Sequence, residues 1–115
     1  MRFWLCFVVA AVAAPVSAQT YTCEGTEPAW SLDLTQTTAT FDYIGETEMT
    51  IPQTSRAEGR SWPVAMTLIS ADFSSTAIVI LHDRMCQTGQ SHEVQVLTQR
   101  QDLPVLLTGC CNVVD

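Results

Sequence analysis

Trp30-Ser31-Leu32-Asp33-Leu34 alternates strictly between apolar and polar residues. Successive side chains of a β-strand point to opposite faces, so this period of two predicts a strand with one packed face and one solvated face. The same alternation recurs in residues 39–43, 49–51, 64–68 and 94–96. No long segment repeats its apolar residues at helical spacing. The sequence therefore predicts an all-β domain.

Short polar or glycine-containing segments separate these runs, as at Thr88-Gly89-Gln90. Roughly eight short strands, spaced about 8–12 residues apart, are typical of a small antiparallel barrel or sandwich. Residues 77–81 are apolar throughout, which predicts a central strand that is buried on both faces or covered by a loop. Residues 52–61 are expected to form a loop or a short helical turn.

Residues 1–18 have the pattern of an export signal. Arg2 provides the positive start, residues 3–14 are apolar, and Val16-Ser17-Ala18 is a cleavage site of the A-x-A type. The apolar run is shorter than the about 20 residues that span a bilayer, and no later run is longer. We therefore expect cleavage after Ala18 and a single domain, residues 19–115, that is periplasmic or secreted and does not insert into the membrane.

Four cysteines lie beyond the predicted cleavage point: Cys23, Cys86, Cys110 and Cys111. In a small exported domain, an even number of cysteines indicates disulfides, and two are predicted here. Because Cys110 and Cys111 are adjacent, their side chains would leave a strand on opposite faces. We expect one of them to bind Cys23 and the other Cys86, and the sequence leaves open which takes which.

The chain is acidic, with a formal net charge of −7 from 12 acidic and five basic residues. Removing Arg2 with the signal leaves four arginines and no lysine, a net charge of 4 − 12 = −8. Nucleic-acid binding relies on lysine and arginine, so nucleic acid is not an expected partner. Anionic lipid headgroups would also be repelled. The charge favours a cationic protein or envelope component, or serves only to keep the protein in solution.

The sequence contains no catalytic motif and points to no cofactor, so we do not expect an enzyme. Trp30 follows closely on Pro28, and Trp62 directly precedes Pro63. Both positions suit the start of a strand near a barrel mouth. Both indoles are either core residues or ligand platforms. We take Trp30, Trp62 and Glu27 as candidate ligand-binding residues at that mouth.

His82 and His92 are the two histidines of the chain, at the end of one predicted strand and the start of the next. If residues 83–91 form a hairpin loop, the two imidazoles would face each other at its base. With a sulfur ligand they would then form a copper or zinc site. The alternative is two separate histidines at strand ends, beside a cysteine that is already in a disulfide.

Three motifs carry a resemblance to a known family. Cys23-Glu24-Gly25-Thr26-Glu27-Pro28-Ala29-Trp30-Ser31-Leu32 resembles the opening motif, C-x-G-x-E-P-x-W-S-L, of a family of small uncharacterised exported proteins and lipoproteins of Gram-negative bacteria. Cys86-Gln87-Thr88-Gly89-Gln90-Ser91 is similar to its C-x-D-G-x-S segment, with Thr88 in place of the acid, and Gly109-Cys110-Cys111 is similar to its ending. The resemblance covers the whole mature domain and implies export and disulfides, but no activity.

The small, exported, β-rich and disulfide-bonded build is also similar, as a class, to bacterial inhibitors of c-type lysozyme. Tyr21-Thr22-Cys23 is the short motif that the two share, whereas the lysine such inhibitors use has no counterpart here. Our main hypothesis is a non-catalytic interaction module of the periplasm. The alternatives are a small-ligand or metal-binding protein, and an inhibitor of a cationic enzyme such as lysozyme.

Overall fold

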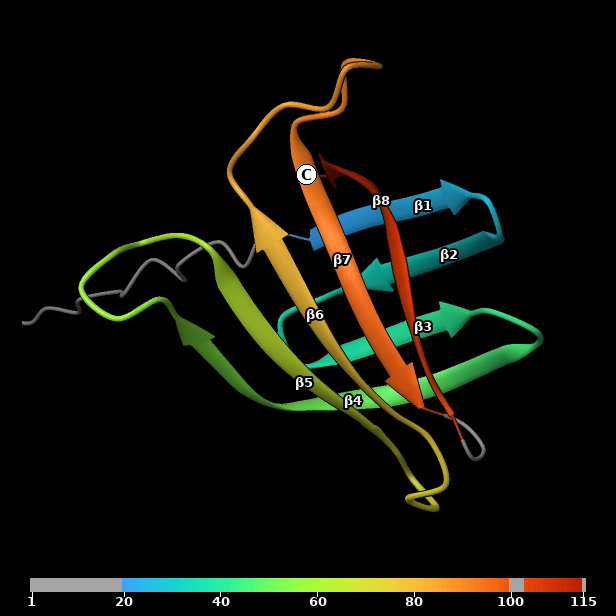
Figure 1. Cartoon of the computed structure of the whole chain (residues 1–115). Helices are drawn as coiled ribbons and strands as arrows, with labels where there is room; N and C mark the ends of the chain where they lie inside the picture. Colours follow the sequence, from blue (N-terminus) through green and yellow to red (C-terminus); the bar gives the residue numbers. More distant parts are fainter. Residues whose placement is uncertain (1–19, 100–102, 115) are drawn as a thin grey trace, which may run out of the picture.

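A computed structural model describes residues 20–99 and 103–114. It contains the strands β1 (Thr20–Thr26), β2 (Ala29–Leu34), β3 (Thr38–Asp42), β4 (Glu46–Arg56), β5 (Val64–Ser70), β6 (Thr76–His82), β7 (His92–Gln99) and β8 (Pro104–Val114). Each strand pairs antiparallel with the next, and β8 pairs with β1, so the sheet closes into a barrel (Figure 1). The predicted antiparallel all-β fold is confirmed, and of the two predicted architectures, barrel and sandwich, it is the barrel. The predicted signal, residues 1–18, lies outside the described residues.

Side-chain alternation fills the barrel interior. In β2, Trp30, Leu32 and Leu34 are buried, whereas Ser31 and Asp33 are exposed. The other strands add apolar side chains to the same core, among them Phe41, Leu68, Val79, Leu81, Val94, Val96 and Leu107. An eight-stranded barrel is just wide enough for side chains to fill it. Contacts with other molecules therefore fall to the outer wall and the ends of this barrel. In the part of the chain described, no helix is long and apolar enough to cross a membrane.

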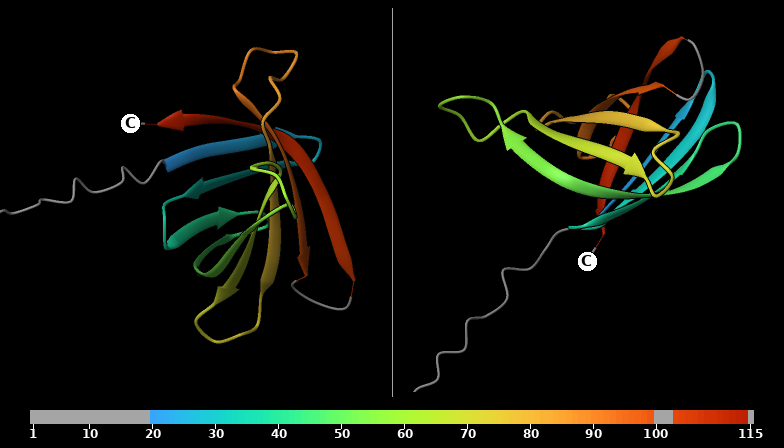
Figure 2. Two further views of the ribbon diagram at one scale, coloured as in Figure 1. Left: turned by 90° about the vertical axis from the view of Figure 1, so that its left-hand side faces the viewer. Right: turned by 90° about the horizontal axis from the view of Figure 1, so that it is seen from below.

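Two predictions about single elements need correction. β6 is not buried on both faces, because a closed sheet has one inner face: Val79 points inward and Ile78 is 42% exposed on the outside. Residues 52–56 are not a loop but continue β4 as an exposed strand, after a register shift between Thr50 and Gln53. Beyond Arg56 the connection to β5 extends away from the barrel (Figure 2).

The two disulfides use opposite faces of β8, as the adjacent cysteines predicted. Cys111 lies opposite Cys23 of β1 and binds it inside the barrel, where both are fully buried. Cys110 binds Cys86, which belongs to the connection between β6 and β7. Two disulfides in so small a barrel are compatible with an oxidising, exported compartment.

Trp30 fills the barrel interior beneath two glycines. A Cβ built on Gly25 would lie 2.8 Å from Cε2 of the indole, and one built on Gly109 would lie 2.7 Å from its Cζ2. The indole Nε1 donates a hydrogen bond to the carbonyl oxygen of Thr108 at 3.1 Å. Glycine at both positions therefore gives the indole its space in the wall formed by β1 and β8.

Candidate functional site around the β6–β7 connection

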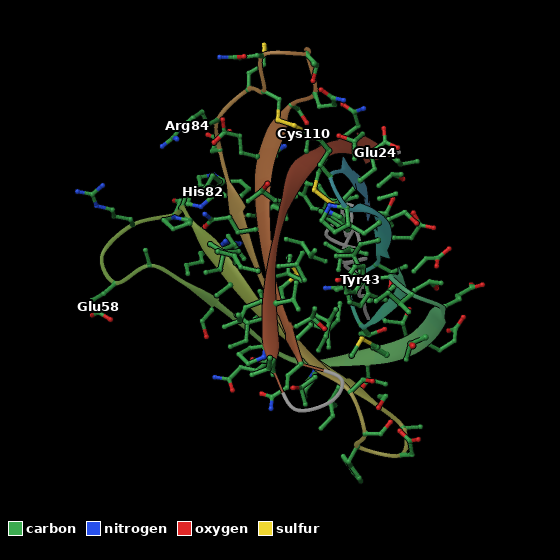
Figure 3. All side chains as sticks on the ribbon, turned by 45° about the vertical axis from the view of Figure 1, so that its right-hand side comes forward. Glu24, Tyr43, Glu58, His82, Arg84 and Cys110 are labelled. Carbon is green, nitrogen blue, oxygen red and sulfur yellow. A yellow bond between two sulfur atoms is a disulfide. The ribbon has the colours of Figure 1, made fainter. Side chains whose placement is uncertain are left out.

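Residues 83–91 connect β6 to β7 and gather most of the predicted site residues around them. The connection folds tightly, because the amide of Cys86 donates to the carbonyl of Gln90 and the amide of Gly89 to the carbonyl of Cys86, both at 2.9 Å. Gly89 has a φ of 103°, which glycine adopts without strain. The Cys86–Cys110 disulfide then fixes the connection to β8 (Figure 3). Its position on the barrel is therefore covalently set.

A groove of about 540 Å³, here named the His82 groove, lies on one side of this connection. Nε2 of His82 lies 3.3 Å from Oε1 of Gln95, and Nη1 of Arg84 forms an ion pair with Oε1 of Glu93 at 3.2 Å. The remaining lining comes from Cys86, Gln87, Thr88, Val94, Thr108, Gly109 and Cys110. The His82 groove thus offers hydrogen-bond donors and acceptors, including the positive guanidinium of Arg84 and the negative carboxylate of Glu93.

A second groove of about 430 Å³, here named the Glu24 groove, is lined by residues from β1, the β1–β2 turn, β8 and the β6–β7 connection. Glu24 and Glu27 contribute carboxylates, and Thr88 and Gln90 contribute a hydroxyl and an amide. Gly25, Thr26, Thr108, Gly109 and Cys110 complete it, so no basic side chain is among its lining residues. In Figure 3, Glu24 lies on one side of the connection, and His82 and Arg84 lie on the other.

The Glu24 groove continues into an acidic outer wall made by β1 to β4. In register, Glu24 lies opposite Ser31, Ser31 opposite Asp42, and Asp42 opposite Glu46. A second row runs from Thr22 through Asp33 and Thr40 to Glu48. We name this surface the acidic wall; its carboxylates are Glu24, Asp33, Asp42, Glu46 and Glu48, all exposed. The two rows contain no basic residue, so cations are attracted to this side of the molecule.

On the inner side of the sheet, His92 closes the barrel between two aromatic rings. Its ring meets Tyr21 edge to face at a centroid distance of 5.4 Å and lies 5.1 Å from Trp62. Burial raises the pKa of the Tyr21 phenol, and the nearby Arg56 partly offsets this shift. Trp62 is half-buried against the core, so these rings seal the end of the barrel.

The polar contacts of His92 are with its neighbour Ser91 and with Asp83. Nδ1 lies 2.8 Å from Oγ of Ser91, and Nε2 lies 3.7 Å from Oδ1 of Asp83. The Ser91 hydroxyl also donates to the carbonyl of Cys111 at 3.3 Å. These contacts tie the start of β7 to β8 and to the β6–β7 connection.

The structure separates several residues that the sequence placed together. His82 lies on the outer face of the sheet and the buried His92 on the inner face, so of the two arrangements that the sequence left open, the structure has the separate histidines and not the facing pair. Within residues 20–99 and 103–114, no cluster of three or more histidine, cysteine, aspartate or glutamate side chains is arranged to hold a metal. Trp30 is 4% exposed, which makes it a core residue instead of a ligand platform. Glu27 lies in the Glu24 groove, which neither Trp30 nor Trp62 lines.

Sequence reasoning did not assign the groove residues Arg84, Thr88, Gln90 and Gln95. Parity along a strand places Gln95 on the outer face, but parity is lost across a connection such as residues 83–91. How the connection folds over β8 depends on the choice of Cys110 as the partner of Cys86, which the sequence left open.

Comparison with protein-family models, curated proteins and solved structures finds no match to this chain. The resemblance to the family of exported Gram-negative proteins, and the class-level similarity to lysozyme inhibitors, therefore stay predictions.

Proposed function

We propose that this protein is a non-catalytic interaction module of the bacterial envelope that binds a cationic protein through the Glu24 groove. One observation carries the proposal: Glu24 and Glu27 flank a groove that is lined without a basic side chain and is continuous with the acidic wall. A lysine or arginine side chain of a partner would enter beside the two carboxylates. Thr88 and Gln90 would accept further hydrogen bonds from it.

A rigid groove suits this role. The Cys86–Cys110 disulfide fixes the side of the groove formed by the β6–β7 connection, and strand pairing fixes the side formed by β1 and β8. Little conformational freedom remains to be lost when a partner binds, which favours affinity. The surrounding acidic wall would speed the encounter with a basic protein by long-range attraction, and salt would weaken that attraction.

Binding to basic proteins tests the proposal, with c-type lysozyme as the first probe and an acidic protein of similar size as the comparison. We expect the affinity for lysozyme to fall as NaCl is raised from 50 to 500 mM. Replacing both groove carboxylates, Glu24→Gln with Glu27→Gln, should raise Kd about three- to tenfold at 50 mM NaCl, as expected for two exposed charges. Biolayer interferometry on the mature, oxidised protein gives these values.

The matched control is Glu58→Gln, which removes a carboxylate from the β4–β5 connection, on the other side of the molecule from Glu24 (Figure 3). This variant should bind lysozyme as the unmodified protein does. An equal loss in the control and the groove variant would mean nonspecific charge attraction. Failure of every basic protein tested to bind above the acidic one would refute the proposal.

A second candidate function is small-ligand binding in the His82 groove. Arg84, Gln95 and Glu93 supply donors and acceptors at fixed positions, which is how ligand sites set orientation. Native mass spectrometry of protein recovered from the periplasm should then show a bound mass that disappears on denaturation. Identical native and denatured masses would argue against this second function.

A further inference from the structure

An uncharged, partly apolar surface covers the outer face of β5 to β8, opposite in character to the acidic wall. We name it the apolar wall and define it by the outward residues Ile69, Ile78, Ile80, Leu97 and Leu106. Ile78 lies directly opposite Leu97, and Leu97 directly opposite Leu106, so the three form one continuous row across three strands. They are 42%, 44% and 59% exposed.

The outward residues between these apolar side chains are alanine, threonine and glutamine. Among the described residues, charged side chains flank this surface at its two ends: Arg84 pairs with Glu93 beside the β6–β7 connection, and Asp72 is exposed in the β5–β6 hairpin. A surface without charges across four strands is notable in a chain that carries a net charge of −7. The largest contiguous apolar patch on a small protein, typically about 300–600 Å², often serves as a contact surface.

We infer that the apolar wall binds a second copy of this chain, forming a weak two-fold symmetric dimer. Two molecules of the same net charge repel each other wherever their acidic walls approach. Packing apolar wall against apolar wall is the arrangement that places both acidic walls on the outside. With a two-fold axis along β7, Leu97 of each copy meets Leu97 of the other, and Ile78 meets Leu106. This surface is therefore self-complementary, as a two-fold interface must be.

The size of the wall sets the strength of this contact. Four strands about 4.8 Å apart, each contributing two or three outward residues, cover about 300–400 Å². Stable dimers bury about 800 Å² on each partner, so this contact alone is weaker. Phe73 and Leu103, exposed in the β5–β6 and β7–β8 hairpins, can add to it. We expect monomers at low micromolar concentration and dimers at concentrations on the order of 100 µM or above.

Sedimentation velocity of the mature, oxidised protein between 10 µM and 1 mM tests the inference. We expect a shift from monomer to dimer with concentration. Leu97→Glu places a carboxylate at the two-fold axis, opposite the same carboxylate of the other copy, and should raise the self-association Kd at least tenfold. Because Leu97 is already partly exposed, we expect its melting temperature to remain close to that of the unmodified protein. Ile78→Thr, which keeps a β-branched residue in the strand, should weaken association as well.

The matched control is Thr22→Glu, which adds the same charge at an exposed position of β1, on the acidic wall. It should leave self-association within about twofold of the unmodified value. A protein that stays monomeric at 1 mM would overturn the inference. So would dimers that survive Leu97→Glu, since the contact would then lie elsewhere on the molecule.

Discussion

Asp72 organises the hairpin between β5 and β6 by accepting three hydrogen bonds on one oxygen. Oδ1 accepts from the hydroxyl of Ser70 at 2.8 Å, and from the hydroxyl and amide of Ser74 at 2.7 and 3.0 Å. The hydrogen bonds from Ser74 contribute most to lowering the pKa of this carboxyl to about 2. The ionised form is therefore favoured in the folded protein.

This pKa predicts a local acid sensitivity. The folded-state pKa lies below the unfolded value of 3.8, so the stabilisation is complete above pH 4 and is lost as the pH falls toward 2. Asp72→Asn should make the unfolding free energy less dependent on pH between 4 and 2, because asparagine does not titrate. Urea unfolding at pH 7, 4 and 2.5 measures this, with Glu58→Gln as the control. Equal pH dependence in Asp72→Asn and the unmodified protein would contradict the assignment.

Gly109 shows how one missing side chain shapes the wall of the barrel. An alanine methyl there would meet the backbone carbonyl of Glu24 and the indole of Trp30, neither of which can move easily. We expect Gly109→Ala to destabilise the protein by about 1–3 kcal/mol, the usual cost of overpacking a core. Ser31→Ala, at an exposed position of β2, is the control. Unchanged urea midpoints for Gly109→Ala would show that the indole has room to shift.

At the scale of elements, sequence periodicity predicted the strands but not whether each of their faces is buried or exposed. The alternation at Trp30 to Leu34 predicted β2 because its polar residues are charged or hydroxylated, so the inner face was unambiguous. In β6 both faces are apolar, and periodicity cannot distinguish a buried outer face from an exposed contact surface. For this reason Ile78 was expected to be buried or covered, whereas it is exposed on the outer face.

The site was harder to predict than the fold, because it depends on a connection. Glu27 was a candidate ligand-binding residue and does line the Glu24 groove, but its role stays a prediction and the groove itself was not predicted. The sequence left open whether the two histidines face each other, because their relative orientation depends on how residues 83–91 run between two strands. The prediction that Cys110 and Cys111 bind different partners is confirmed, because it required only that adjacent side chains of one strand point to opposite faces. The relative positions of side chains within one strand could thus be predicted from the sequence, whereas those of side chains on either side of a connection could not.

The Cys86–Cys110 disulfide should matter more for binding than for folding. It closes a separation of 24 residues, for which the chain-entropy model gives about 3–4 kcal/mol, against about 4–5 kcal/mol for the separation of 88 at Cys23–Cys111. Replacing Cys86 and Cys110 by serine should leave a folded barrel with a lower Tm and a loss of lysozyme binding at least as large as in the Glu24/Glu27 variant. Replacing Cys23 and Cys111 should lower Tm further, because serine would be buried in the core. Circular dichroism melts and the same binding assay separate the two effects, and unchanged binding in the first variant would refute a role for the fixed connection.

At the scale of the whole molecule, the barrel has two outer walls of different chemistry. β1 to β4 present carboxylates and threonines, and β5 to β8 present isoleucine and leucine. The two proposed contacts therefore respond oppositely to salt. Screening weakens attraction between the acidic wall and a basic partner, and it relieves repulsion between two acidic copies. Raising NaCl from 50 to 500 mM should weaken lysozyme binding and strengthen self-association, so each proposal can fail without the other.

The Cys23–Cys111 bond has a mechanical consequence. It links the first strand to the last, and Thr20 lies opposite Val114, so both ends of the described chain leave the barrel side by side. A force pulling those ends apart would detach only the few residues outside the disulfide. The S–S bond itself would then carry the tension. The segments between Cys23 and Cys111 would bear none of that tension. Under stretching, the oxidised barrel is a closed ring that does not lengthen, and a reductant would convert it into an extensible chain.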